Sequence, residues 1–325
     1  MSLLARWPPD SLFTQAVTDY ANDTAYHRPV MLRECLEALE IQPHGRYVDV
    51  TFGGGGHSAR MLERLQSPGH LFSFDQDADA EAQAAQLVRP EFTFIRANFR
   101  HLYQELDQRG VLPVDGLLAD LGVSSHQFDT PERGFSTRFD GPLDMRMDPD
   151  GDDTSAADII NDYPEAELHR IFGMYGEVTN ARTLAATVAG ARRGQSITTI
   201  AALKKAIAPC TPRGKENKYL AQVFQALRIE ANDEMAALRD MLEQTAQVLR
   251  PGGRLVVMSY HSLEDRLVKN FLAKGKFFGE ADKDLFGRTD LPFSVVTRKP
   301  IEATAEEIAL NSRARSAKLR IAIKN

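Results

Sequence analysis

The sequence predicts an α/β protein in which an all-helical segment interrupts a mostly parallel β-sheet. Three observations support this fold class. Short apolar runs typical of strands alternate with helical runs up to about residue 121, only helical runs follow between residues 130 and 217, and strand-like runs then return. Strands separated by helices imply right-handed crossovers and a parallel sheet that is covered on both faces.

The first part of the chain contains four predicted strands. Residues 46–52 form a β-branched and aromatic run of the kind that fills a buried strand, and apolar residues at helical spacing follow the four glycines Gly53 to Gly56. The same alternation continues downstream. The predicted strands are 46–52, 69–75, 91–96 and 114–121, and the predicted helices are 59–65, 77–87 and 99–106.

The later part begins with an acid-rich loop at residues 144–153 and contains a long predicted helix at 220–249. A Pro-Gly-Gly turn at 251–253 then leads into an apolar strand, and an antiparallel hairpin should complete the sheet. The other predicted elements are helices 164–174, 180–193, 198–207 and 263–273 and strands 293–298 and 317–323. The predicted domains are an N-terminal extension (1–26), a first sheet part (27–129), a helical insertion (130–217) and a second sheet part (218–325).

Composition restricts the class of protein. The 325 residues are 43% hydrophobic, which is enough for a sizeable core, and the net charge of −6 argues against a protein that coats nucleic acid indiscriminately. Cys35 and Cys210 show no metal-ligand or disulfide spacing, which favours a reducing compartment and predicts no structural zinc. No apolar stretch approaches the ~20 residues of a membrane span, so we expect a cytoplasmic protein.

The glycine run lies between a predicted strand and a predicted helix, where bare backbone can approach a nucleotide-like ligand. Asp75 ends the next strand about 20 residues later, where nucleotide-binding βαβ units place the carboxylate that binds ribose. A dinucleotide fingerprint would require a third glycine at the position of Ser58, so that class is excluded.

Enzymes that use S-adenosylmethionine provide a better match. They carry an acid after the first strand, a glycine turn, an acid after the second strand and a Pro-Gly-Gly turn before the fifth. Asp49, the glycine run, Asp75 and residues 251–253 occur here in that order. The sequence therefore predicts a Rossmann-like class I methyltransferase, with a mostly parallel seven-stranded sheet, a terminal hairpin and an inserted all-helical domain.

A closer resemblance covers residues 27 to 320. The chain resembles the bacterial 16S ribosomal RNA cytosine-N4 methyltransferase family, small-subunit methyltransferase H of the MraW type. One segment, Lys218-Tyr-Leu-Ala-Gln222, departs from the family pattern. The stretches that carry the resemblance are His27-Arg-Pro-Val-Met-Leu-Arg-Glu34, Asp49 to His57, Asp115 to Gln127, Arg133-Gly-Phe-Ser136, Leu143-Asp-Met-Arg146, Phe224 to Ile229, Pro251 to Leu255, Ser259 to Arg266 and Arg313 to Arg320.

The resemblance implies a binding site for S-adenosylmethionine. Asp75 would accept the ribose hydroxyls, Phe99 would cover the adenine ring, and the charge of Asp120 would favour the cationic cofactor over the neutral product. The implied cofactor-binding residues are Gly55, Gly56, His57, Asp75, Phe99, Asp120 and Gln127.

Three residues are candidates for catalysis. The lone pair of a cytosine amine is delocalised into the ring, so transfer requires acceptors that draw the amine toward tetrahedral geometry as its proton leaves. Asp120 and Ser124 occupy the place after the fourth strand where DNA amino-methyltransferases carry a Pro-Pro loop. His261, just past the fifth strand, could contact the flipped base or move a proton.

Simpler interpretations stay open for several of these residues. Asp49 could only cap the turn, His57 could be a capping or packing residue, Phe99 could belong to the core, and His261 could be structural. The acidic run at 144–153 lacks the spacing of a calcium loop, so we expect a solvated loop and no bound metal.

A basic C-terminal segment is the candidate RNA contact. Arg313, Arg315 and Lys318 belong to a run without acids on an acidic protein, and Tyr260 could stack on a base. Alternation in the last strand places its apolar residues in the core and its basic residues, including Arg320, outward.

The predicted function is therefore methylation of the N4 amine of a cytidine in 16S ribosomal RNA. The predicted substrate is this RNA in an assembled or nearly assembled small subunit, with naked RNA as the alternative. A homodimer is compatible with the sequence. Two other classes stay open: a methyltransferase for DNA or a small molecule, and an RNA-binding assembly factor without turnover. The absent Pro-Pro loop argues against DNA, and the intact Asp75 and Asp120 argue against a loss of turnover.

Overall fold

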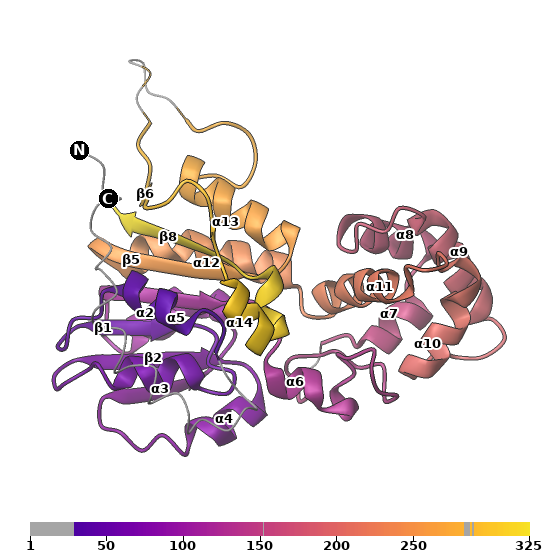
Figure 1. Ribbon diagram of the computed structural model, residues 1–325, viewed down its shortest axis with the longest axis horizontal. Helices are drawn as coiled ribbons and strands as arrows, with labels where there is room; N and C mark the ends of the chain where they lie inside the picture. Colours follow the sequence, from indigo (N-terminus) through magenta and orange to yellow (C-terminus); the bar gives the residue numbers. More distant parts are fainter. Residues whose placement is uncertain (1–28, 152, 283–286, 288) are drawn as a thin grey trace.

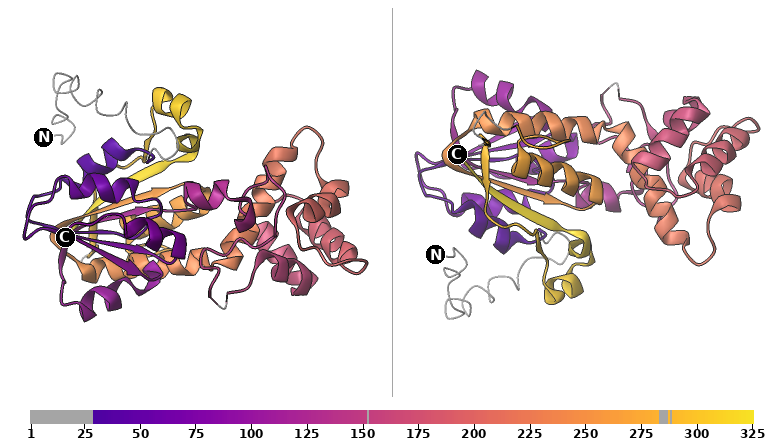
Figure 2. Two further views of the ribbon diagram at one scale, coloured as in Figure 1. Left: turned by 90° about the horizontal axis from the view of Figure 1, so that it is seen from below. Right: turned by 90° about the horizontal axis from the view of Figure 1, so that it is seen from above.

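The computed structural model describes residues 29–151, 153–282, 287 and 289–325. It has two parts, a sheet domain and a helical lobe whose core runs from Phe135 to Ala231. Figure 1 shows the sheet domain with its covering helices on one side and the lobe extending from the other, and both views in Figure 2 show the same elongated arrangement. The predicted N-terminal extension lies outside the described residues.

The sheet confirms the predicted topology. Its strand order is β3-β2-β1-β4-β5-β8-β6, β1 to β5 run parallel, and β8 is antiparallel to its neighbours. The short strand β7 also pairs with β8, so the sheet has eight strands where seven were predicted. The strands are β1 (Arg46–Asp49), β2 (His70–Asp75), β3 (Phe92–Arg96), β4 (Val114–Asp120), β5 (Leu249–Ser259), β6 (Phe293–Val295), β7 (Ile301–Glu302) and β8 (Lys318–Lys324).

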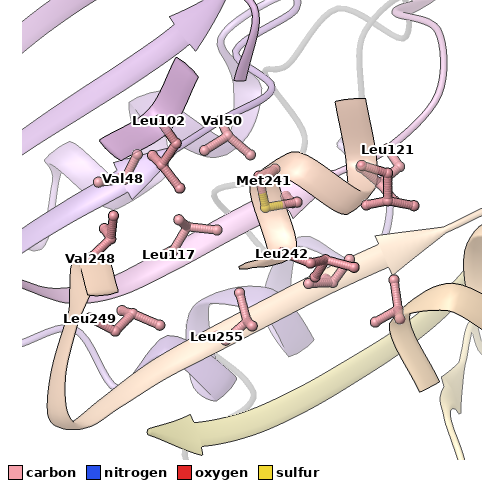
Figure 3. Packing of buried hydrophobic residues seen from close by; sticks show 14 of the residues in the cluster. Val48, Val50, Leu102, Leu117, Leu121, Met241, Leu242, Val248, Leu249 and Leu255 are labelled. Carbon is pink, nitrogen blue, oxygen red and sulfur yellow. The ribbon is translucent and has the colours of Figure 1, made fainter. Parts of the chain in front are cut away.

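Helices cover both faces of the sheet. Alternate strand residues point to opposite faces, so Val48 and Leu117 pack with Met241 on one face while Tyr47 and Leu118 belong to the core on the other. Figure 3 shows the first of these packing layers. The helices of this domain are α2 (Leu32–Leu39), α3 (Gly56–Leu62), α4 (Ala78–Ala84), η4 (Phe99–His101), α5 (Leu102–Gln108), α6 (Ser125–Asp129), η5 (Pro131–Arg133), α12 (Glu234–Val248), α13 (Ser262–Lys274), α14 (Ala305–Leu310) and η7 (Ser312–Ser316).

The helical lobe has a separate hydrophobic core. Helix α11 packs within this core through Phe224 and Leu227, so the lobe's packing continues past the predicted boundary at residue 217. The lobe contains α7 (Ala156–Asp162), α8 (Glu165–Met174), α9 (Ala181–Ala191), α10 (Ile200–Ile207), η6 (Ala208–Cys210) and α11 (Glu216–Ala231).

The prediction of one long helix at 220–249 was wrong, because the chain breaks between α11 and α12. Asp233 adopts a left-handed conformation with φ +46°, and Asn232 bonds the carbonyl of Met145 and the amide of Met147. Asn and Asp are poor residues for a helix interior, because their side chains compete for hydrogen bonds outside the helix. The break lets α11 join the lobe while α12 covers the sheet.

The last strand also departs from the prediction. β8 lies between β5 and β6, and Arg320 is buried although alternation placed it outward. Its Nε donates to Asp265 Oδ1 at 2.7 Å, so an acid on α13 neutralises the guanidinium inside the protein. In the part of the chain that the structure describes, no helix is both long and apolar enough to cross a membrane.

Candidate functional site

A cavity of about 520 Å³ opens at the carboxyl ends of β1, β2 and β4, where parallel sheets bind their ligands. It collects most of the residues that the sequence singled out. Those that line it are Gly56, His57, Asp75, Phe99, Asp120, Ser124, Gln127, Tyr260 and Arg313, whereas Gly55, His261, Arg315 and Lys318 do not.

The glycine turn presents bare backbone to this cavity. Gly53 has φ +53°, and a Cβ added at Gly54 would meet no atom within 4 Å, so the chain there is open to a ligand. Gly55 is buried with φ +77°, and an added Cβ would lie 2.6 Å from the ring of Phe52. Gly55 therefore shapes the turn from behind, while Gly53, Gly54 and Gly56 face the cavity.

Asp75 is fixed by the backbone around it. Its Oδ2 accepts from the amide of Gly53 at 2.8 Å, and its Oδ1 accepts from the amide of Asp77 at 3.0 Å. Burial raises the pKa of Asp75 to about 6, against the opposing effect of these two hydrogen bonds. Each carboxylate oxygen keeps a lone pair for a further donor, such as a ribose hydroxyl.

Asp49 stabilises the glycine turn. It is fully buried, it accepts from Ser58 Oγ at 2.6 Å and from the amide of Thr51 at 3.1 Å, and it does not line the cavity. These contacts support the capping interpretation of Asp49 over a direct ligand contact. Ser58, which excluded the dinucleotide fingerprint, is thus the residue that holds Asp49 in place.

Asp120 ends β4 with its side chain 22% exposed in the cavity wall. Its backbone N–H donates to Thr51 Oγ1 at 2.7 Å, and its Oδ1 accepts from the hydroxyl of Tyr260 at 2.8 Å. Burial raises the pKa of Asp120 to about 6, while His57 and Tyr260 act in the opposite direction. The base-stacking role predicted for Tyr260 stays untested, but its hydroxyl is already bound to Asp120.

His57 lies beside Asp120 in the first turn of α3. Its Nε2 is 3.1 Å from the carbonyl oxygen of Val30, and its Nδ1 is 3.7 Å from Asp120 Oδ2. Burial lowers the pKa of His57, against the attraction of Asp120, which favours a neutral ring.

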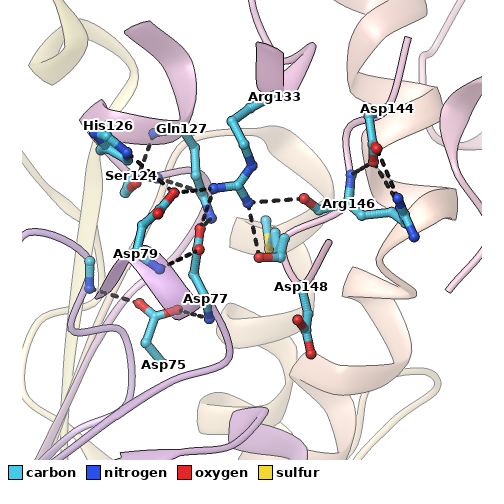
Figure 4. A network of polar contacts seen from close by, with 12 residues as sticks. Asp75, Asp77, Asp79, Ser124, His126, Gln127, Arg133, Asp144, Arg146 and Asp148 are labelled. Atoms are coloured by element: carbon cyan, nitrogen blue, oxygen red, sulfur yellow. Dashed lines mark hydrogen bonds and ion pairs between the residues drawn. The ribbon is translucent and has the colours of Figure 1, made fainter. Parts of the chain in front are cut away.

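Gln127 lines the cavity and belongs to a polar network (Figure 4). Its Nε2 donates to Asp77 Oδ2 at 2.7 Å, and Arg133 binds the same carboxylate at 2.8 Å. Arg133 also donates to the carbonyls of Arg146 and Met147. Ser124 caps α6 by accepting from the amide of Gln127, so its oxygen already has a donor.

His261 lies outside the cavity lining and caps α13. Its Nδ1 accepts from the amide of Glu264, and its Nε2 is 3.1 Å from Glu264 Oε1. Glu234, His261 and Glu264 offer ligand atoms within 4.8 Å of one another, as a metal site would. However, Arg228 binds both oxygens of Glu234, and backbone amides bind Glu264. These contacts support the structural interpretation of His261.

The predicted RNA-binding cations differ in their surroundings. Arg313 contacts Ser125, donates to Asp129 Oδ2 at 2.7 Å and lies 5.6 Å from the ring centre of Phe128. Lys318 lies 3.8 Å from Asp265. Arg315 is exposed, and no ion pair is found for it among the described residues.

The sequence analysis did not single out the residues by which the helical lobe contributes to this cavity. Met147, Ala221 and Arg228 line it from the lobe side. Arg228 belongs to the motif Phe224 to Ile229, and Ala221 lies in the segment that departs from the family pattern. The motif includes Arg228, but the sequence did not indicate that its side chain lines the cavity.

The residues present suit S-adenosylmethionine. Asp75 offers acceptors for ribose, Phe99 supplies an aromatic face, and the open backbone at Gly54 can approach the methionine part. Asp120 adds a carboxylate that attracts a sulfonium. The cavity thus offers acceptors, an aromatic face and a negative charge, which a cationic nucleoside cofactor requires.

Comparison with known proteins identifies the relatives of this chain. Residues 24–325 match the family described as the MraW methylase family. A ribosomal RNA small subunit methyltransferase H from Cytophaga hutchinsonii is 59% identical over 297 residues, which is 91% of this chain and 99% of that protein. The protein of the same name from Parabacteroides distasonis is 57% identical over 303 residues, covering 93% and 98%.

Proposed function

Because the chain belongs to the MraW methylase family, we propose that this S-adenosylmethionine-dependent methyltransferase modifies the N4 amine of a cytidine in 16S ribosomal RNA. Its relatives from Cytophaga hutchinsonii and Parabacteroides distasonis are named as methyltransferases of small-subunit ribosomal RNA. The single observation that supports the amine as acceptor is Asp120, whose carboxylate lines the cavity at the end of β4.

The chemistry of a cytosine amine explains why Asp120 is the leading candidate. When bound, S-adenosylmethionine supplies a methyl group on a positively charged sulfur. The amine becomes a better nucleophile when an acceptor binds its hydrogen and draws the nitrogen out of conjugation with the ring. Ser124 is less suited to this role, because a neutral hydroxyl is a much weaker base than a carboxylate and one of its two lone pairs already accepts from the amide of Gln127.

The helical lobe forms a second wall of the cavity, and contacts with this wall would help to select the RNA. Arg228 and Ala221 of α11 line the cavity together with residues of the sheet domain, so a base entering it would pass between the two parts. Exposed Arg315 could contact a phosphate, and contacts of this kind position RNA without reading its sequence. We propose an assembled or nearly assembled small subunit as the substrate and place the reaction in the cytoplasm; a homodimer also stays a prediction.

The test is to identify the modified nucleoside. The protein is incubated with S-adenosylmethionine carrying a labelled methyl group and with small subunits that lack the modification, and the RNA is digested to nucleosides. We expect the label in N4-methylcytidine, and a much lower yield from the Asp120→Asn variant. Label on a base carbon, on ribose, or nowhere would contradict the proposal.

A further inference from the structure

Three side chains from separate elements meet at one corner of the cavity. Tyr260, after β5, donates its hydroxyl to Asp120 Oδ1 at 2.8 Å. His57, on α3, places Nδ1 3.7 Å from Asp120 Oδ2. Asp120 thus has one oxygen engaged by a donor and one oxygen facing an imidazole nitrogen beyond hydrogen-bond distance.

The contact with Val30 defines the tautomer of His57. A backbone carbonyl can only accept, so the 3.1 Å contact between His57 Nε2 and Val30 O requires a hydrogen on Nε2. In a neutral ring, Nδ1 then carries a bare lone pair. Two acceptors, His57 Nδ1 and Asp120 Oδ2, therefore face each other without a hydrogen between them.

We propose that His57 and Asp120 act as one proton-accepting pair, in which Asp120 Oδ2 receives a hydrogen of the substrate amine and His57 Nδ1 shares it. Tyr260 holds Oδ1 and so keeps Oδ2 turned toward both the substrate and His57. This inference rests on the proposed function, because it assigns the proton that amine methylation releases. Asp120 would touch the substrate, whereas His57 and Tyr260 would act through Asp120 as positioning residues.

The step balances in atoms and charge. The amine lone pair forms the N–CH₃ bond, and the electrons of the S–CH₃ bond stay on sulfur. One N–H bond breaks, its electrons remain on nitrogen, and its proton goes to Asp120 Oδ2. A protonated Oδ2 can then donate to His57 Nδ1, so the unfavourable approach of two acceptors becomes a hydrogen bond.

The pair has further titratable neighbours on three elements. Other titratable groups that influence it are Asp49 on β1, Glu264 on α13 and the fully buried thiol of Cys35 on α2. Burial lowers the pKa of His57 and raises the pKa of Asp120. Both shifts favour the neutral forms of the two groups, a bare Nδ1 and a protonated carboxyl, between which a hydrogen bond can form.

The His57→Gln variant tests the pair. A glutamine amide can still donate to Val30 O, but its oxygen is not basic enough to hold a proton. We expect single-turnover methyl transfer at saturating S-adenosylmethionine to slow about tenfold or more. The acidic limb of its pH profile should also move to lower pH, because the neutral His57 ring, unlike a charged ring that would lower the pKa of Asp120, accepts a hydrogen bond from the protonated carboxyl. An unchanged saturated rate with an unchanged limb would overturn the inference.

Tyr260→Phe serves as a second variant that keeps the ring and removes only the donor to Oδ1. We expect a slower saturated rate, with the acidic limb moved to higher pH, because Tyr260 stabilises the ionised form of Asp120. A limb that stays in place would show that the hydroxyl does not act on Asp120 during the reaction.

Nitrogen-15 NMR of histidine-labelled protein tests the tautomer without any turnover. We expect His57 at neutral pH to carry hydrogen on Nε2 and none on Nδ1. Hydrogen on Nδ1, or a charged ring, would overturn the inference even in an active enzyme. If the wild-type protein instead formed no N4-methylcytidine, the proposed function would fail while this NMR result could still stand.

Discussion

The ends of β2 and β4 carry the same residue in similar surroundings, yet their contacts differ. Asp75 and Asp120 both line the cavity, and burial raises the pKa of each to about 6. Backbone amides hold both oxygens of Asp75. At Asp120, by contrast, the hydroxyl of Tyr260 holds one oxygen and the other faces His57.

This difference separates binding from proton transfer. Rigid backbone donors fix the orientation of Asp75 and favour its charged form, which suits a permanent acceptor for ribose hydroxyls. Side chains surround Asp120, and one of its oxygens can still gain a hydrogen. A raised pKa alone would not distinguish the two aspartates; the partners of each oxygen do.

The largest expected effect is on the rate of methyl transfer. Asp120→Asn removes the proton acceptor but keeps the side-chain volume, so the rate at saturating S-adenosylmethionine should fall by about 10²- to 10⁴-fold. Single-turnover kinetics measures this rate. Asp115→Asn, at the opposite end of the same strand, is the matched control and should keep the wild-type rate. Full turnover by Asp120→Asn would remove the distinction between the two aspartates.

Asp75→Asn should change the affinity for S-adenosylmethionine rather than the saturated rate. Loss of a charged acceptor weakens a hydrogen bond to ribose by about 1.5–3 kcal/mol, so the Kd of S-adenosylmethionine should rise about 10- to 100-fold. Calorimetric titration measures the Kd. If the affinity stayed at the wild-type value while the saturated rate collapsed, the roles of Asp75 and Asp120 would have to be exchanged.

Stability should also distinguish the two positions. The folded pKa of Asp120, about 6, exceeds its ordinary value of 3.8, so the folded state binds this proton more tightly than the unfolded chain does. The resulting stabilisation is complete below pH 3.8 and is lost as the pH rises through 6. Asp120→Asn removes the carboxylate whose ionisation destabilises the folded state above pH 6. The substitution should therefore raise the free energy of unfolding at pH 7.5 by about 1–3 kcal/mol.

Denaturant unfolding at several pH values checks this stability effect. The gain should shrink as the pH falls through 6 and disappear below 3.8, where Asp120 is protonated in both states. Asp75→Asn should gain less, since a neutral amide replaces a carboxylate that accepts two backbone hydrogen bonds. Equal gains at both positions would show that burial dominates over the specific partners.

The smallest effect is expected far from both aspartates. Arg315→Glu should raise the KM for small subunits about two- to fivefold, because one phosphate contact contributes little on its own. The Kd of S-adenosylmethionine should stay the same. Arg313→Glu is the contrasting variant, since Arg313 lines the cavity and pairs with Asp129. A change in cofactor affinity with Arg315→Glu would contradict its assignment to RNA.

Local pattern was sufficient to predict most of the sheet domain. Buried parallel strands form short apolar runs, and the glycine and Pro-Gly-Gly turns mark their ends. The break at Asn232 was missed, because apolar spacing continues across it and only contacts with Met145 and Met147 end the helix. Burial of Arg320 was missed for a similar reason, since its partner Asp265 lies on another element.

The site was predictable where a residue's role follows from its place on a strand. Asp75 and Asp120 lie at strand ends, which a sequence can locate. The position of His261 past β5 gave no indication that its ring turns toward Glu264 and away from the cavity. The direction of a side chain after a strand depends on tertiary packing. The position of Arg228 in the cavity wall also depends on how the helical lobe packs.

The pH dependence of single-turnover methyl transfer shows whether Asp120 accepts the proton of the substrate amine. At saturating S-adenosylmethionine, the wild-type rate should rise with pH along an acidic limb and then level off, because the acceptor must lose its proton before it can take one. The pKa of about 6 for Asp120 in the free protein should fall when the positive sulfonium binds. We expect Asp120→Asn to abolish this limb and to leave a slow, flat profile. An acidic limb that persists unchanged in Asp120→Asn would contradict this role of Asp120.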